Sequence, residues 1–234
     1  MDLGSLHLST VPDMAAALPG WADYPEHRWM TVAAAVVLLV VLPELRQLMP
    51  ALTGGLSRRR GNIEIEHSLS VARSRNYCAR MLFIPFIVVA DRYDLLPADY
   101  LAPWSEPWLR LAEIAGMVLG FVLLRVILHA LIFAAFPPRL DHETGSAVRK
   151  GFYNYFIIFT LGVLLTLCVF VFTHSCDEIV RHVIWCEGIV LWCISIWREK
   201  QILGANCSGL RTFLYLCGLE FLPVAVLALC VLLL

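Results

Sequence analysis

Long apolar segments alternate with short polar ones over most of this chain. An α-helix needs about 20 mostly apolar residues to cross the hydrocarbon core of a bilayer. Six segments reach or approach that length, at about 30–49, 77–96, 109–136, 152–174, 179–197 and 212–234. The pattern predicts an all-α, polytopic membrane helix bundle with about six transmembrane helices.

The second segment is the shortest of the six. Tyr77–Leu96 has only ten uncharged residues at its centre, Met81 to Ala90. Whether this segment crosses decides the topology, because every later loop changes sides if it only dips into the membrane and returns.

The distribution of positive charge distinguishes these two threadings. With six crossings, thirteen of the 18 Lys and Arg residues lie in loops on one side, four lie on the other, and Arg125 lies inside the third segment. Cytoplasmic loops carry an excess of Lys and Arg. If the second segment did not cross, the basic loops around Arg149 and Lys200 would face outward, against this bias. The charges therefore favour six spans with both termini facing outward.

Composition limits the classes of function. Hydrophobic residues make up 59% of the chain and charged residues 16%, whereas a soluble domain carries about 25% charge. A net charge of −1 argues against nucleic acid as a partner. The eight cysteines lack zinc-type spacing, and no nucleophile elbow or phosphate-binding loop is present. The sequence predicts a non-enzymatic protein with no cofactor and no metal site.

The N-terminal end differs from the rest of the chain. Residues 1–29 lack the basic start and the continuous apolar stretch of a signal peptide. We expect a periplasmic N-terminal tail at 1–29, followed by a single transmembrane helical domain at 30–234.

Four ionisable residues fall inside the predicted spans. Counted from the cytoplasmic end at 1.5 Å per residue, they lie between about 10 and 16 Å deep. They are Arg125, His129, Glu187 and Glu220. Ionisable groups at such depth are rare and mark a partner or a function, so we expect these four to form one intramembrane polar network across the third, fifth and sixth spans.

Three interpretations of this network stay open. The charges can pair with one another and only set the registry of the helices. They can also form a proton or ion relay, because one arginine and two glutamates leave a surplus negative charge. In the third interpretation they face a partner subunit.

Two further features predict helix geometry. Gly116 and Gly120 share a face of the third span, opposite Arg125, and small residues at this spacing suit close helix packing. A helix with two specialised faces is expected to be central in the bundle. Pro223 cannot donate a backbone N–H, so it frees the carbonyl of Leu219 and predicts a helix kink.

The last span also carries a recognisable pattern. The stretch Phe213–Pro223 reads FLYLCGLEFLP and resembles the terminal signature of a domain-of-unknown-function family of multi-pass inner-membrane proteins from Bacteroidota, F-L-Y-L-C-x-L-E-x-L-P. The resemblance implies a lineage and a place in the bacterial inner (cytoplasmic) membrane, and it implies no reaction or ligand.

We therefore expect an integral inner-membrane protein that acts as a non-enzymatic subunit or scaffold of an envelope complex. Its expected partners are the lipid bilayer and a membrane protein or further copies of itself. The alternative is a small transporter or channel that uses the Arg/His/Glu layer for proton or ion coupling.

Overall fold

The computed structural model describes residues 21, 25–58, 61–96, 107–135, 142–173, 176–206 and 209–233, and these residues contain no strand. The helices are α1 (Pro25–Ser57), α2 (Gly61–His67), α3 (Leu69–Arg92), α4 (Pro107–Ala135), α5 (His142–Thr173), α6 (Asp177–Asn206), α7 (Gly209–Leu216), the π-helical turn η2 (Cys217–Phe221) and α8 (Leu222–Leu233). The predicted all-helical bundle is confirmed.

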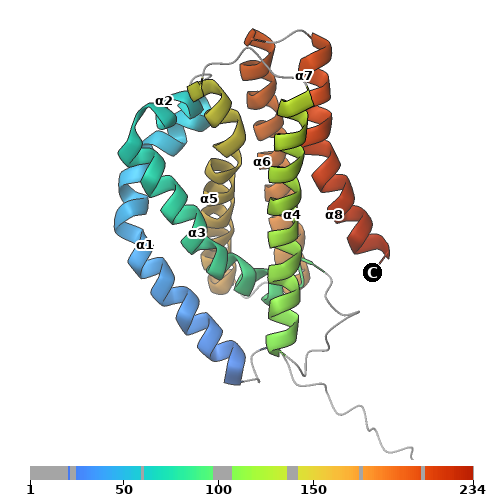
Figure 1. Ribbon diagram of the computed structural model, residues 1–234. Helices are drawn as coiled ribbons and strands as arrows, with labels where there is room; N and C mark the ends of the chain where they lie inside the picture. The colour runs from blue at the N-terminus through green and yellow to red at the C-terminus, as the bar shows by residue number, and fades with distance from the viewer. Residues whose placement is uncertain are drawn as a thin grey trace, which may run out of the picture.

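The long helices run in alternating directions (Figure 1). We call the end where α2 lies the α2 end, and the other the opposite end. Helix α1 rises to the α2 end, α3 returns, α4 rises, α5 returns and α6 rises. The last segment, from α7 to α8, runs back toward the opposite end, where α1 begins. This path is the one expected of a six-span protein with both termini on one side.

Five helical segments are long and apolar enough to cross a membrane: Pro25–Ser57, Pro107–Ile132, Gly145–Phe172, Asp177–Ala205 and Thr212–Leu229. These make the chain a multi-pass membrane protein. Helix α3 has 24 residues, about 36 Å, so it is long enough to cross a membrane but not apolar enough to be one of the five candidate spans. Its first half carries Arg73, Arg75 and Arg80, which confines its apolar part to the second half.

Several helices extend beyond the predicted spans. Helix α5 begins at His142 rather than at residue 152, and α6 continues to Asn206 rather than ending at 197. Charged flanks end the apolar stretch but do not end the helix, because Arg, Lys and Glu are good helix formers. Of the predicted tail at 1–29, residues 1–20 and 22–24 lie outside the described part of the chain, and α1 already begins at Pro25.

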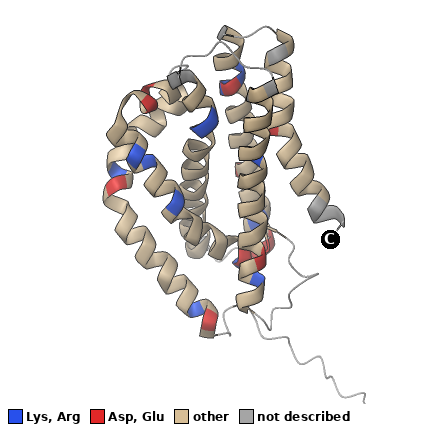
Figure 2. Ribbon diagram, viewed as in Figure 1, with Lys and Arg blue, Asp and Glu red and all other residues tan. Residues whose placement is uncertain are grey.

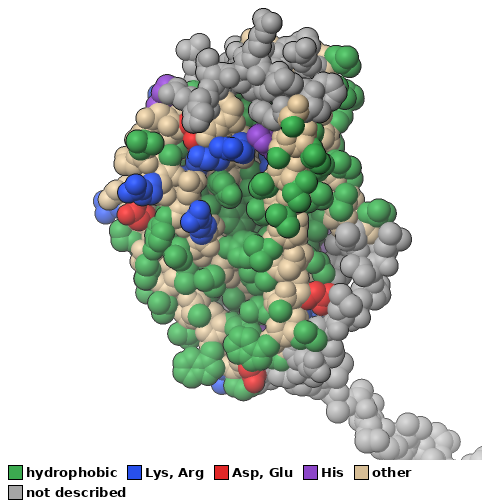
Figure 3. Space-filling view, viewed as in Figure 1, with side chains coloured by type: hydrophobic (Ala, Val, Ile, Leu, Met, Phe, Trp, Pro, Cys, Tyr) green, Lys and Arg blue, Asp and Glu red, His purple; other side chains and the backbone are tan. Residues whose placement is uncertain are grey.

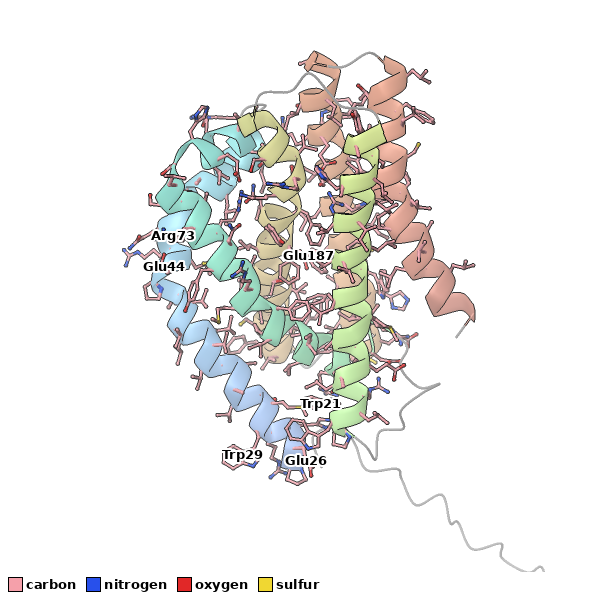
Figure 4. The ribbon with its side chains drawn as sticks, viewed as in Figure 1. Trp21, Glu26, Trp29, Glu44, Arg73 and Glu187 are labelled. Atoms are coloured by element: carbon pink, nitrogen blue, oxygen red, sulfur yellow. The ribbon has the colours of Figure 1, made fainter. Side chains whose placement is uncertain are left out.

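Four apolar clusters hold the described helices together, and the two larger ones involve α3. Helices α1, α3 and α5 meet around Val41, Leu48, Leu82 and Ile157, all buried. A second cluster joins α3 to α4, α5 and α6, where Ala90, Ile114, Val163 and Ile184 are buried. Glu44 of α1, labelled in Figure 4, accepts a hydrogen bond of 2.6 Å from Ser74 of α3. Helix α3 thus packs between α1 and α5; in its polar half Arg75 is buried and paired with Glu66, whereas Arg73 and Arg80 lie on the exposed side.

The outer surface of the bundle is mostly apolar. Hydrophobic side chains cover much of the face seen in Figure 3. In Figure 2 the lower half of α1 has charged residues only at its very end, Glu26 and Arg28, and most of α8 has none. Helix α4 is the least covered of the five candidate spans: only 11% of its most apolar stretch is buried. The expectation that this helix is central is wrong, because it contacts its neighbours along one side only.

The α2 end is closed by close backbone contacts and polar side chains. Gly61 lies against the backbone of Gly54, so any side chain there would collide. Asn154 of α5 donates to Asn62 of α2 over 3.1 Å. Arg198 of α6 donates to the carbonyl oxygens of Leu56 and Ser57. Because the last carbonyls of a helix lack partners and carry partial negative charge, this arginine stabilises the end of α1.

Glu66 of α2 joins three elements at this end. It pairs with Arg75 of α3, accepts a hydrogen bond of 2.7 Å from Ser146 of α5, and lies 3.5 Å from the Lys150 Nζ. Burial alone raises the pKa of the Glu66 carboxyl, but the Ser146 hydrogen bond and the Arg75 guanidinium outweigh it and hold the pKa below its ordinary value of 4.5.

Glu66 is therefore expected to make stability depend on acid. A carboxyl whose pKa is lowered by folding stabilises the protein fully above the unfolded-state pKa, and loses that contribution as the pH falls below it. Glu66→Gln should lower the free energy of unfolding at pH 7 by about 1.5–3 kcal/mol and flatten its decline below pH 4.5. The measurement is denaturant unfolding in micelles between neutral and acidic pH. Glu64→Gln, on the exposed side of the same helix, should leave the profile unchanged; an equal effect would contradict the assignment.

Candidate functional site

Arg125 of α4 is the centre of a buried polar cluster. Its Nη2 pairs with Glu220 of η2 and lies 3.2 Å from Oε1 of Glu199 in α6. Its Nη1 donates to the Leu219 carbonyl over 3.2 Å. The guanidinium also lies 5.0 Å from the centroid of the Phe152 ring of α5, a cation–π distance. One side chain therefore ties α4 to α5, α6 and the last helical segment.

The backbone of the last segment explains why Leu219 accepts this hydrogen bond. Pro223 has no N–H to offer the carbonyl four residues earlier, and the helix opens into a π turn at Cys217–Phe221. Lipid cannot satisfy the freed carbonyl. Arg125 supplies the donor, and the same turn carries the Glu220 carboxyl to the same guanidinium.

The cluster is buried and contains more carboxyl groups than cationic groups. Arg125 is 8% exposed, and Glu199 and Glu220 are each 2% exposed. Two carboxyl groups thus face one guanidinium in a region where a lone charge is costly. We call this set, Arg125, Glu199 and Glu220, the charge cluster.

Glu187 does not join the charge cluster. Its carboxylate accepts from Thr166 of α5 over 3.4 Å, and it lies over Gly162, where a side chain would collide with its Oε1. The grouping of Glu187 with Arg125 is wrong. Glu187 lies twelve residues before Glu199, about 18 Å along the helix, and Figure 4 shows it midway along the bundle.

Glu199 is the functional candidate that the sequence reasoning missed. The apolar stretch of α6 ends at Trp197, which predicts a loop at Glu199, but the helix continues to Asn206. A helical signal was present in the sequence. One buried face of α6 carries Ile184, Ser195, Glu199 and Ile202. Their separations along the chain are sums of three and four residues, the spacing of one face of an α-helix. The face periodicity, rather than hydropathy, places Glu199 inside the bundle.

His129 lies one helical turn beyond Arg125 on α4. The two side chains line one small cavity, together with Arg149 and Phe152 of α5 and Leu219. The structure therefore brings Arg125, His129 and Glu220 to one region, with His129 on the side of the α2 end.

The face that carries Gly116 and Gly120 does not pack within the described chain. A side-chain atom added at either glycine would meet nothing within 4 Å, and both residues are exposed. The expected contact of this face inside the bundle is wrong, because Arg125 and Ile114 turn the other side of α4 inward.

A second buried cluster lies at the opposite end, and sequence reasoning missed it as well. Asp91 at the end of α3 is bound by Arg110 Nε of α4 over 2.8 Å and by Trp21 Nε1 over 2.6 Å. His27 of α1 lies 3.6 Å from the same carboxylate and stacks on Trp21 with ring centroids 4.3 Å apart. Asp91, Arg110 and His27 are fully buried. We call these four residues the Asp91 cluster; Trp21 is labelled in Figure 4.

The turn after α3 completes the Asp91 cluster. Asp94 has a positive φ of 47°, a conformation that aspartate tolerates better than most residues. Its carboxylate accepts from Arg110 Nη2 over 2.6 Å. The guanidinium of Arg110 thus holds two carboxylates, one from the helix and one from the turn.

The chemistry open to these clusters is electrostatic. Among the described residues, no group of three or more His, Cys, Asp or Glu side chains is placed to hold a metal ion. The charge cluster can hold helices in register, and its two carboxyl groups are of the kind that exchange a proton or bind a cation.

Comparison with known proteins adds no relative: no model of a protein family matches the chain, and no curated protein or solved structure matches it.

Proposed function

We propose that this protein is a non-enzymatic subunit or scaffold of a membrane complex, and that α4 is the helix that meets its partner. The observation that carries the proposal is the contrast between the two sides of α4. One side holds the charge cluster, and the other is exposed along its whole length. Small residues lie on the exposed side at four-residue spacing, at Ala112, Gly116 and Gly120.

This exposed face fits a helix better than it fits lipid. Helices in a bilayer associate through close packing, and small residues let two backbones approach. Glycine in a helix interior destabilises the helix by about 1 kcal/mol relative to alanine. No packing contact within the described chain offsets this cost, since a Cβ added at either glycine would meet nothing within 4 Å. A partner helix seated on this face would recover that cost.

Substitution of both glycines tests the proposal. Gly116→Ile with Gly120→Ile should release the partner, or convert a homo-oligomer into monomers, because the added side chains hold the helices apart. Gly116→Ala with Gly120→Ala is the matched control and should keep the assembly. Neither pair should unfold the bundle, since both positions are exposed and a Cβ added at either one meets nothing within 4 Å. The readout is the size and composition of the complex extracted in mild detergent. A wild-type protein that runs as a lone monomer, or an isoleucine variant with an unchanged assembly, contradicts the proposal.

The second candidate is a small transporter or channel that couples to protons or ions. The observation in its favour is the excess carboxyl of the charge cluster, which lies next to a cavity lined by Arg125 and Glu220. In this case the substrate passes beside the cluster and one carboxyl exchanges a proton or cation.

Orientation and location belong to the same proposal. The six-span path assigns thirteen of the 18 Lys and Arg residues to one side, and the described ones among them that lie near the α2 end, such as Arg149, Lys150 and Arg198, support a cytoplasmic α2 end. The bacterial inner membrane, and membership in the Bacteroidota family that the Phe213–Pro223 pattern resembles, are proposed on that pattern alone.

A further inference from the structure

An apolar cavity of about 310 Å³ lies among α3, α4, α5, α6 and the last helical segment, η2 and α8. Five phenylalanines form much of its wall: Phe86, Phe121, Phe152, Phe156 and Phe159. Two other wall residues, Trp185 and Ile189, are about half exposed at 48% and 54%. The cavity is thus open to the hydrocarbon region of the membrane, and a ligand reaches it from the bilayer.

One wall residue calls for a hydrogen-bond acceptor. The indole Nε1 of Trp192 is buried and has no hydrogen-bond partner among the described residues. Its ring packs edge-on against Phe221 with centroids 5.4 Å apart. Water cannot serve this N–H inside a bilayer, so a ligand gains by bringing an acceptor. Because neighbouring side chains cover the Nε1, the indole has to shift slightly toward the cavity that Trp192 lines.

The charges beside the cavity restrict the head group of the ligand. Arg125 and Glu220 line the wall, and Arg125 is already matched by two carboxyl groups. An anionic head group would find no free cation there, because Arg125 is already bound to Glu199 and Glu220. An ammonium head group has no acceptor to offer Trp192. A neutral carbonyl satisfies both conditions.

Size and wall chemistry restrict the body of the ligand. A cavity of about 150 Å³ holds one benzene ring, so 310 Å³ suits two fused six-membered rings. Flat rings also make favourable stacked or edge-on contacts with phenylalanine.

We propose that this cavity binds a neutral, flat, carbonyl-bearing amphiphile of the naphthoquinone class. The fused rings lie among the phenylalanines, and one carbonyl oxygen accepts a hydrogen bond from Trp192 Nε1. This inference does not depend on the partner of α4, because the cavity and the glycine face lie on different sides of that helix.

Equilibrium binding to the protein in nanodiscs tests the proposal, with empty nanodiscs as background. The probe is 2-methyl-1,4-naphthoquinone, compared with 2-methylnaphthalene, which has the same rings and no carbonyl. One quinone should bind per chain. Trp192→Phe should weaken quinone binding about tenfold, the effect of one hydrogen bond to a buried donor, and should not change the binding of 2-methylnaphthalene. Trp197→Phe changes an exposed tryptophan of the same helix that does not line the cavity; it is the matched control and should bind the quinone as wild type does.

A second pair of variants tests the cavity independently of the donor. Val224 lines the cavity, whereas Val226 of the same helix is exposed and does not. Val224→Phe should abolish quinone binding and Val226→Phe should preserve it. Tight binding to Val224→Phe, equal affinity for the two probes, or no saturable binding to wild type would each overturn the proposal.

Discussion

Arg125→Leu is expected to lower the free energy of unfolding by about 3–5 kcal/mol, the usual cost of removing one partner of a buried ion pair. The variant leaves the Glu199 and Glu220 carboxyl groups without their cation and the Leu219 carbonyl without its donor, all of them buried. Unfolding in detergent micelles, followed by circular dichroism, measures the change.

Two comparisons show whether the loss belongs to the charge cluster. Arg125→Leu combined with Glu199→Gln and Glu220→Gln removes every charge of the cluster together and should recover most of the stability, because replacing a whole buried ion pair is often neutral. Glu187→Gln changes a carboxyl outside the cluster and should have a small effect. If Arg125→Leu alone is as stable as wild type, the cluster does not hold the helices.

Substitution of Glu220 in this cluster distinguishes the two proposed functions. In a subunit or scaffold, Glu220→Gln acts through stability and protein level. In a transporter or channel, Glu220→Gln removes a proton- or ion-dependent phenotype while the protein level stays normal.

Asp91→Asn is expected to be as costly at the opposite end, again about 3–5 kcal/mol. The substitution removes the charge that faces Arg110, which is fully buried, and it weakens the acceptor of Trp21. Asp94 then remains as the second carboxylate on Arg110. Because Asp91 joins α1, α3 and α4, we expect the end of the bundle to loosen, and hydrogen exchange of α3 residues measures this directly.

An exposed ion pair close by is the matched control. Arg92 and Asp177 are 3.1 Å apart, with side chains 36% and 60% exposed. Asp177→Asn should cost no more than about 1 kcal/mol, as exposed ion pairs do. Equal effects of the two substitutions would show that the Asp91 cluster contributes no more than a surface pair.

Hydropathy alone was enough to predict the architecture. Five of the six predicted segments coincide with helices that can cross a membrane. The exception is α3, whose ten apolar residues are too few for a lipid-facing span but sufficient for a helix covered by α1 and α5. An apolar side chain can face either lipid or a neighbouring helix, and hydropathy does not distinguish the two. Only the structure shows that the apolar residues of α3 pack against neighbouring helices.

The candidate site was predicted only in part. The count of residues from the cytoplasmic end of each span predicts a similar depth for Arg125, His129 and Glu220, and the structure places them in one region. The same count wrongly groups Glu187 with them. It leaves out Glu199, because the apolar stretch ends before this residue whereas helix α6 continues to Asn206. The Asp91 cluster was missed for a related reason: its members lie near segment ends, where polar residues are ordinary.

By itself, the sequence determined that the chain is a multi-pass helical membrane protein, since about 20 apolar residues in a row have few other stable environments. It also placed Glu220 and Pro223 on one helix, where backbone geometry alone frees the Leu219 carbonyl. Only the tertiary structure decided which carboxyl groups meet Arg125, because that depends on the rotation and length of α6. It likewise left Gly116 and Gly120 outside the bundle, since side chains from several helices together decide which face of α4 turns inward.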